Sequence, residues 1–223
     1  MQLTPDLPSG TPSFELEADE IDTVIDLICR GAGEARVQMT PGLIEVPMTN
    51  IVRKAMKRVK RRLGLTNLEV SGEVEIDDMS TEGAELLGRI DIILKFLRQF
   101  GNEDDYVGVE CKRVGAGSAY SQLNSRYVTQ GAIRFVNGQY ATGHAWGFML
   151  GYVLALPADE IIQTIDQRLR KDYGEVAKLE TAPAHADALS IHEGVLQQNS
   201  GSAIRLRHLM VDMTGAAPQF PSP

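Results

Sequence analysis

LEVSGEVEID at 68–77, GRIDIILKF at 88–96 and YVGVECKR at 106–113 share one pattern. Apolar and polar residues alternate in each of them with the period of two that is typical of a β-strand. In the first stretch every odd-numbered residue is polar, which predicts a strand with one solvated face. In the third stretch, Glu110 and Lys112 fall on one face, which we expect to point outward.

Helical patterns flank these strands on both sides. Apolar residues recur at the 3.6-residue spacing of amphipathic helices, which predicts helices at 21–28, 47–62, 118–136 and 159–173. Gly31 and Gly33 are expected to end the first helix, and Gly64 the second. Further strands are predicted at 146–156, 188–195 and 203–213. The predicted fold is therefore α/β, with helices on both faces of a mixed sheet and a C-terminal helix and β-hairpin.

The composition predicts a single domain in the cytoplasm. We expect this domain to cover residues 13–214, with disordered ends at 1–12 and 215–223 that are rich in proline, serine, threonine and alanine. No apolar run is long enough to span a membrane, and the N-terminus has no secretory signal. Only two cysteines are present, too few for a disulfide framework or a cysteine-rich zinc site.

The net charge of −8 hides a basic segment. Residues 51–62 hold seven of the 22 lysines and arginines and no acidic residue. A local positive stripe can attract nucleic-acid phosphates even on an acidic protein. We therefore expect backbone contacts from Lys54, Lys57, Arg58 and Arg61. The alternative is an ordinary solvated helix face.

Three charged residues fall on neighbouring predicted strands. Asp91 lies on the polar face of the second strand, and Glu110 and Lys112 share a face of the third. Carboxylate oxygens are preferred ligands of Mg²⁺, which polarises a phosphoryl oxygen and lowers the pKa of a bound water. A lysine can orient that water or offset transition-state charge. The alternative is a surface salt bridge of the acids with Lys95 or Lys112.

The spacing Asp91-x18-Glu110-x-Lys112 resembles the motif of the PD-(D/E)XK, or restriction-endonuclease-like, nuclease superfamily. The order of elements over roughly residues 40–156 matches the αβββαβ core of that superfamily. One departure is Ile90, which stands where the motif has proline. The resemblance implies that Asp91 and Glu110 bind Mg²⁺ or Mn²⁺ and that Lys112 acts on the attacking water.

The resemblance also implies auxiliary residues. Glu45, just before the second helix, matches the acid that many members supply from the first core helix, and would be a third metal-binding carboxylate. Alternatively, Glu45 only complements the helix dipole. Gln130 is the candidate polar residue on the helix after the third strand. Arg126 and Arg134, four residues to either side of it, are expected to bind phosphate, unless this is an ordinary solvated face.

These features predict a Mg²⁺- or Mn²⁺-dependent nuclease acting on DNA, with RNA the less favoured substrate. Few residues remain beyond the core for a sequence-reading domain, so specificity is expected to be low or supplied by a partner subunit or a homodimer. Analogy from fold suggests an effector of bacterial anti-phage defence. The alternative from another class is a catalytically silent nuclease fold that serves as a nucleic-acid-binding or assembly subunit.

Overall fold

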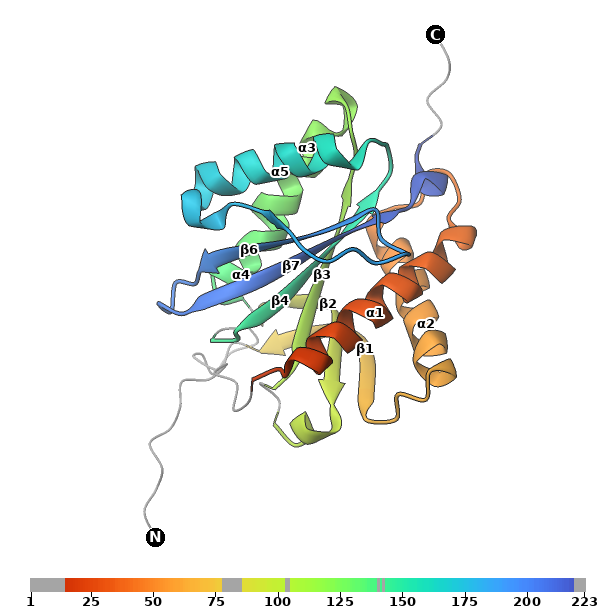
Figure 1. Ribbon diagram of the computed structural model, residues 1–223, viewed down its shortest axis with the longest axis vertical. Coiled ribbons are helices and arrows are strands. Elements are labelled where there is room, and N and C mark those ends of the chain that lie inside the picture. Colours follow the sequence, from red (N-terminus) through yellow and green to blue (C-terminus); the bar gives the residue numbers. More distant parts are fainter. Residues whose placement is uncertain (1–14, 78–85, 103–104, 140, 142, 219–223) are drawn as a thin grey trace.

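The protein is an α/β structure with a seven-stranded mixed sheet between two helical layers (Figure 1). The computed structural model describes residues 15–77, 86–102, 105–139, 141 and 143–218. The strands lie in the order β1-β2-β3-β4-β7-β6-β5. β4 runs parallel to both β3 and β7, whereas the other neighbours are antiparallel. The strands are β1 (Leu68–Asp77), β2 (Leu86–Phe96), β3 (Val107–Val114), β4 (Trp146–Val153), β5 (Glu180–Thr181), β6 (Ser190–Gln197) and β7 (Ala203–Asp212).

Each face of the sheet has its own hydrophobic core. Helices α1 (Ala18–Ala35) and α2 (Glu45–Arg62) cover one face, where side chains such as Phe148 and Leu150 of β4 pack against them. Helix α5 (Ala158–Tyr173) and the helical segment after β3 cover the other face. That segment comprises α3 (Ser121–Arg126), the π-helix η4 (Tyr127–Ala132) and α4 (Ile133–Val136). The order of α-helices and strands in the described residues confirms the predicted order, whereas the short β5 and the 3₁₀ turns were not predicted.

The predicted end of the first helix was wrong. α1 continues through both glycines as far as Ala35. Gly31 packs directly on α2, where a side chain at this position would collide with Met56. The glycine therefore serves close helix–helix packing rather than chain termination, which the sequence pattern alone does not distinguish.

The outward orientation predicted for the polar face of β3 was also wrong. Glu110 is fully buried and Lys112 nearly so, because α3, η4 and α4 cover this face of the strand. The predicted uniform helix over 118–136 is interrupted by the π-helical turn η4. Tyr127 and Phe135, which belong to this segment, are both completely buried.

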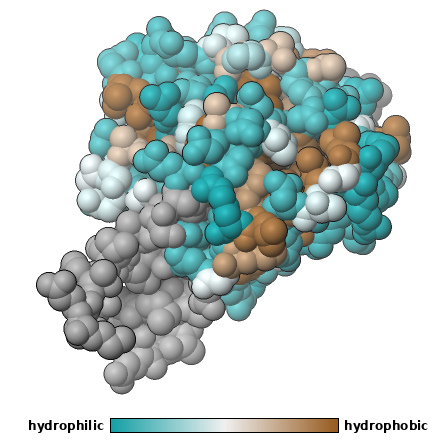
Figure 2. All heavy atoms as spheres, turned by 60° about the horizontal axis from the view of Figure 1, so that its bottom comes forward, coloured by the Kyte–Doolittle hydropathy of each residue, from teal (hydrophilic) through white to brown (hydrophobic). Residues whose placement is uncertain are grey.

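The described C-terminal residues belong to the fold. Thr214–Ala216 form a 3₁₀ turn, and Ala216 is buried against the core, so the predicted disordered tail from residue 215 begins too early. The predicted disordered end at 1–12 and residues 219–223 lie outside the described residues. Of the helices in the described ranges, none is both long and apolar enough to cross a bilayer. Figure 2 shows a largely hydrophilic face with scattered apolar side chains.

Candidate active site

Asp91 lies where β2 and β3 separate. The two strands pair as far as Ile92, which lies opposite Val109. At the next position the carboxylate of Asp91 accepts a hydrogen bond of 2.8 Å from the backbone N–H of Cys111. A side-chain oxygen thus replaces the bond that the next step of the ladder would have made. Continuing the same register places Asp91 beside Glu110, on one face of the sheet.

Lys112 is the centre of a buried ion-pair network. Its Nζ lies 2.7 Å from Oε1 of Glu110 and 2.9 Å from Oε1 of Glu45. The ammonium also donates a hydrogen bond of 3.0 Å to the backbone oxygen of Cys111. The side chain of Lys112 is 9% exposed and that of Glu110 is 0% exposed, so the predicted alternative of a surface salt bridge does not describe this pair.

Glu45 is the first residue of α2, and it ties this helix to β3. One carboxylate oxygen contacts Lys112, and the other accepts a hydrogen bond of 3.2 Å from the backbone N–H of Arg113. Glu45 therefore does more than complement the helix dipole, because it directly contacts the strand that carries Glu110 and Lys112. The structure places Glu45 beside these residues, where its side-chain contact is with Lys112.

The helical segment after β3 supplies the opposite wall. Nη1 of Arg134 lies 3.3 Å from Glu110 and donates a hydrogen bond of 3.1 Å to the backbone oxygen of Arg89. Arg134 was predicted to bind phosphate, but its contacts hold Glu110 in place. Arg126 and Gln130 are exposed on the same wall, and no hydrogen bond of either side chain to a described residue is found.

The π-helical turn brings this wall against the charged residues. A Cβ atom at Gly131 would lie 2.7 Å from Cε of Met149 and 3.3 Å from Cγ of Lys112. Only glycine permits this approach of η4 to β3 and β4. Such π-helical turns are often found at functional sites, where they change the direction of side chains within a helix.

A cavity of about 360 Å³ opens between the start of α2, the end of β3 and the helical wall. Its volume is within the range of small-molecule binding sites. It brings together five of the residues predicted from the sequence. The lining residues are Ile44, Glu45, Val46, Lys112, Arg113, Leu123, Arg126, Gln130 and Arg134.

The charges of the site perturb one another. Burial, reinforced by the neighbouring charge of Glu110, raises the pKa of Asp91 to about 7, against the opposing effects of Lys112 and the Cys111 N–H. Burial alone would lower the pKa of Lys112, but the carboxylates of Glu110, Glu45 and Asp91 raise it above its usual value. Lys112 is therefore a permanent ammonium at neutral pH, and the carboxylates around it favour a further cation.

The donor set fits a cation that needs few protein ligands. Among the described residues, no three histidine, cysteine, aspartate or glutamate side chains form a cluster able to hold a metal ion. The predicted site with three carboxylate ligands is thus not assembled, because Glu45 contacts Lys112 instead. Mg²⁺ often uses only one or two carboxylates and keeps several waters. Asp91 and Glu110, which lie side by side, fit that requirement.

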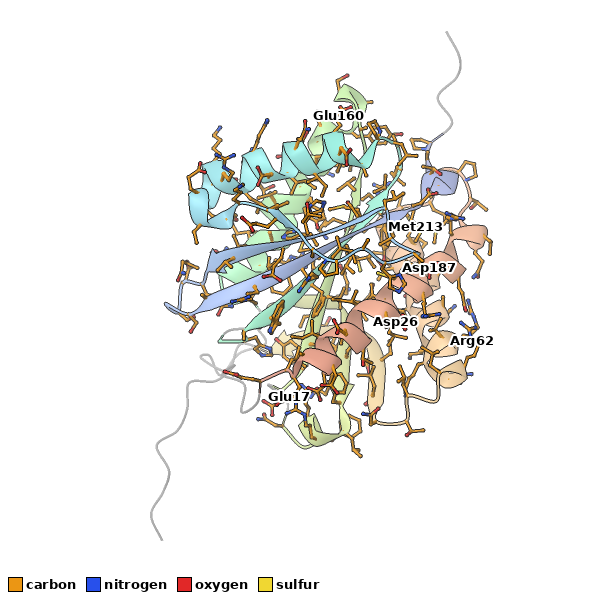
Figure 3. All side chains as sticks on the ribbon, in the orientation of Figure 1. Glu17, Asp26, Arg62, Glu160, Asp187 and Met213 are labelled. Carbon is orange, nitrogen blue, oxygen red and sulfur yellow. The ribbon has the colours of Figure 1, made fainter. Side chains whose placement is uncertain are left out.

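The basic residues of α2 divide into two groups. Arg58 and Arg62 lie against Glu34 of α1, and Figure 3 labels Arg62 at the end of α2. Lys54, Lys57 and Arg61 lie on the side of the helix away from the core. Within the described ranges these three have no carboxylate partner, so their charge is available to a ligand.

The sequence reasoning missed Arg113. Arg113 lines the cavity, and its buried Nε makes no hydrogen bond with any described residue. Alternation along β3 places Arg113 on the face opposite to Lys112, which is why the pattern gave it no role. The cavity reaches both residues because it lies across the end of the strand. The basic character of residues 112–113, at the end of the predicted strand 106–113, was the available signal.

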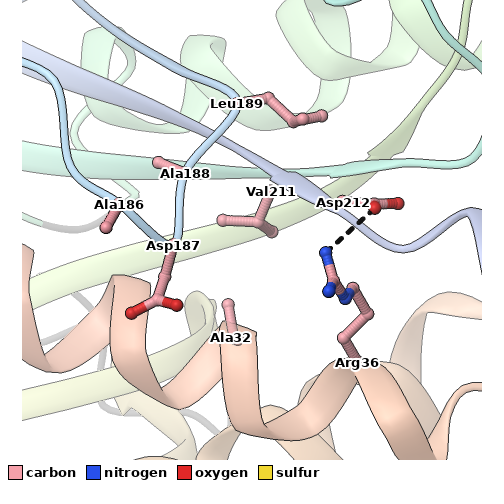
Figure 4. Close-up of a pocket in the computed structure, with 9 residues that line it drawn as sticks. Ala32, Arg36, Ala186, Asp187, Ala188, Leu189, Val211 and Asp212 are labelled. Atoms are coloured by element: carbon pink, nitrogen blue, oxygen red, sulfur yellow. Dashed lines mark hydrogen bonds and ion pairs between the residues drawn. The ribbon is translucent and has the colours of Figure 1, made fainter.

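A second, smaller cavity of about 160 Å³ lies between the end of α1, residues 186–189 and the end of β7 (Figure 4). None of the residues predicted from the sequence lines it. Its charged groups include Arg36 and Asp212, which pair with each other at 3.2 Å. This cavity therefore lacks the combination of buried acids and lysine that distinguishes the first one.

Comparisons with known proteins leave the site to be judged on its own geometry. No protein-family model, curated protein or solved structure matches the chain.

Proposed function

We propose that the protein is a metal-dependent nuclease that hydrolyses phosphodiester bonds of DNA. The observation that carries this proposal is the convergence of Asp91, Glu110 and Lys112 at one end of the β2–β3 pair, beside a cavity lined by arginines. Buried carboxylates with a neighbouring lysine are the groups that metal-assisted phosphodiester hydrolysis requires. The sequence of α2, β1–β3, the α3–α4 segment and β4 supports the proposed PD-(D/E)XK type of core.

In this proposal each residue has a distinct role. Asp91 and Glu110 would hold a Mg²⁺ or Mn²⁺ ion, which would supply charge neutralisation at the scissile phosphate and acidify a bound water. Lys112 orients the attacking water or offsets the negative charge of the transition state. Glu45 holds the ammonium of Lys112 through their 2.9 Å contact, and Arg134 holds Glu110 from the other side.

The alternative function is a silent nuclease fold that only binds nucleic acid. One observation favours it: within the described part of the chain Lys112 bridges Glu45 and Glu110, and no cluster of three metal-binding side chains forms. The intact set of Asp91, Glu110 and Lys112 favours the enzyme. A role in anti-phage defence, in a homodimer or with a partner subunit, remains an analogy from the proposed fold.

A cleavage assay with paired variants tests the proposal. Purified protein is incubated with plasmid, single-stranded DNA and RNA in Mg²⁺, Mn²⁺ or EDTA, next to Glu110→Gln. Cleavage by the wild type in Mg²⁺ or Mn²⁺, abolished in EDTA and in Glu110→Gln, is the expected result. Binding of DNA without cleavage of any substrate would support the silent fold instead.

A further inference from the structure

Two of the groups proposed to carry out the chemistry are almost inaccessible from the surface of the protein. The side chain of Glu110 is 0% exposed and that of Lys112 is 9% exposed. Of the proposed catalytic groups, Lys112 lines the cavity of about 360 Å³ described above, whereas Asp91 and Glu110 are not among its lining residues, so a phosphodiester that reaches Lys112 must enter this cavity. A DNA duplex is too wide to enter a cavity of this size. Because every phosphate of an intact duplex belongs to a paired strand, such a phosphate cannot enter the cavity by itself.

The walls of the cavity match a single nucleic-acid strand. Arg113 and Arg126 provide positive charge, and no described carboxylate pairs with either of them. At the rim, Ile44 and Val46 are 58% and 51% exposed. Apolar rims of this kind can pack against the faces of unstacked bases, while arginines hold the backbone.

Arg113 is the strongest candidate for a phosphate ligand. Its Nε is buried and has no hydrogen-bond partner among the described residues. A buried donor without a partner is costly, and an arginine guanidinium is a strong ligand of phosphate oxygens. Its backbone N–H is already bound to Glu45, which fixes Arg113 next to Lys112 at the end of β3. Arg113 is thus fixed next to the lysine that is proposed to act at the scissile phosphate.

We infer that the cavity admits an unpaired DNA strand and that Arg113 binds a phosphate of that strand. This inference rests on the proposed nuclease function and adds its substrate class. A duplex must then be opened or end in an unpaired segment before it can be cut. Since separating paired and stacked bases costs a few kcal/mol, cleavage within a blunt duplex should be at least about tenfold slower than cleavage of a single strand.

The first test compares substrates and needs no variant. Wild-type protein in Mg²⁺ or Mn²⁺ is given one sequence as a single strand, as a blunt duplex and as a duplex with an unpaired flap. The single strand and the flap should be cut at least about tenfold faster than the blunt duplex. Equal rates on all three would overturn the inference and leave the nuclease function intact. Failure to cut any of them would reject the nuclease function itself.

The second test measures binding without metal. Fluorescence anisotropy of a labelled single strand in EDTA is compared for the wild type, Arg113→Gln and Arg113→Lys. Removing one charge-assisted hydrogen bond to phosphate should weaken binding by Arg113→Gln about tenfold, and Arg113→Lys, which keeps the charge, should be weakened less. Arg168→Gln is the matched control, because Arg168 pairs with Asp172 on α5 and does not line the cavity. Equal affinity of Arg113→Gln and Arg168→Gln would refute the role of Arg113.

Discussion

Asp91 takes the place of a strand partner for Cys111. Its Oδ2 accepts the backbone N–H of Cys111 at 2.8 Å, immediately beyond the last β2–β3 pair. The hydrogen bond fixes the carboxylate on β3, beside Glu110, in a partly buried position. This position makes Asp91 costly to ionise in the absence of a further cation, because burial and the charge of Glu110 raise its pKa to about 7.

The first prediction is that Asp91→Asn stabilises the metal-free protein at pH 8 and abolishes cleavage. The pKa of Asp91 is about 7 in the folded state, against the ordinary value of 3.8 for an unfolded chain. Between these values the folded state binds more protons, so the wild type loses stability as the pH rises from about 4 to 7. An asparagine keeps an acceptor for Cys111 and carries no charge. Urea unfolding in EDTA at several pH values measures the difference.

The gain in the free energy of unfolding of Asp91→Asn over the wild type should be small near pH 4. It should reach the order of a few kcal/mol by pH 8, since each pKa unit corresponds to about 1.4 kcal/mol. Asp172→Asn on α5 is the control, because Asp172 is exposed at the surface and its partner there is Arg168. A difference between Asp91→Asn and the wild type that does not change with pH would contradict the proposed burial of the charge.

The strands and the acids on them could be predicted from the sequence because both follow a simple period. Alternation placed Asp91 and Glu110 on one face of adjacent strands, and the structure brings these two residues together. The covering of that face could not be predicted in the same way. Whether an outward-facing Glu110 meets water or a helix depends on how the segment after β3 folds back, which is a tertiary effect.

The second prediction concerns the metal. Cleavage should require Mg²⁺ or Mn²⁺, because hard carboxylate oxygens dominate the proposed site. Binding of the ion should also stabilise the fold at pH 8, since it neutralises Asp91 and Glu110. Thermal unfolding of the wild type and of the Asp91→Asn/Glu110→Gln double variant, each with and without Mg²⁺, tests this. An equal shift of the transition in both proteins would place the ion elsewhere.

The third prediction separates the structural and chemical roles of Lys112. Lys112→Met should destabilise the protein by about 3 kcal/mol, because it leaves the buried Glu110 without its nearest cation, 2.7 Å away. It should also lower the cleavage rate about a hundredfold or more. Lys112→Arg should not restore the rate, since a planar guanidinium cannot occupy the place of a compact ammonium in so enclosed a site.

The double variant Glu110→Gln/Lys112→Met supplies the control for stability. The double variant removes both charges, so much of the free energy of unfolding that is lost in Lys112→Met should return, while no cleavage is expected. Chemical denaturation of the two single variants and the double variant measures the coupling between the residues. Additive destabilisation in the double variant would mean that the pair at 2.7 Å contributes no interaction energy.

The fourth prediction concerns the close approach of η4 to the sheet. Gly131→Ala should destabilise the fold by about 1–3 kcal/mol, because the new Cβ would lie 2.7 Å from Cε of Met149. It should also displace Lys112, whose Cγ would be 3.3 Å from that atom. Gln130→Ala, at the neighbouring exposed position, is the control and should leave stability nearly unchanged. Equal stability of both variants would contradict the packing described for η4.

The parts of the site that escaped prediction depend on side-chain packing. The roles of Arg134 and Arg113 follow from contacts between elements that are distant in the sequence, namely Arg134 with Glu110 and Arg113 with Glu45. A helical spacing can place Arg134 on a face, but it cannot say whether that face meets a phosphate or a buried carboxylate. Likewise, the sequence pattern predicts a helix end at a glycine such as Gly31, and only the contact with Met56 shows that the glycine serves helix packing.

The last prediction uses the two groups of basic residues on α2. Replacing Lys54, Lys57 and Arg61 together by alanine should weaken DNA binding and reduce the slope of log affinity against log salt. The reduction should be roughly 0.9 for each phosphate that is no longer neutralised in duplex DNA, or 0.7 in a single strand. Within the described chain these residues have no acidic partner.

Arg58→Ala/Arg62→Ala is the matched control from the same helix, because both arginines lie against Glu34. Their charge is partly neutralised, so the slope should change less. Equal reductions of the slope of log affinity against log salt in the two variants would mean that pairing with Glu34 does not determine which residues bind DNA. An unchanged slope in both variants would mean that the basic face of α2 is an ordinary solvated helix face.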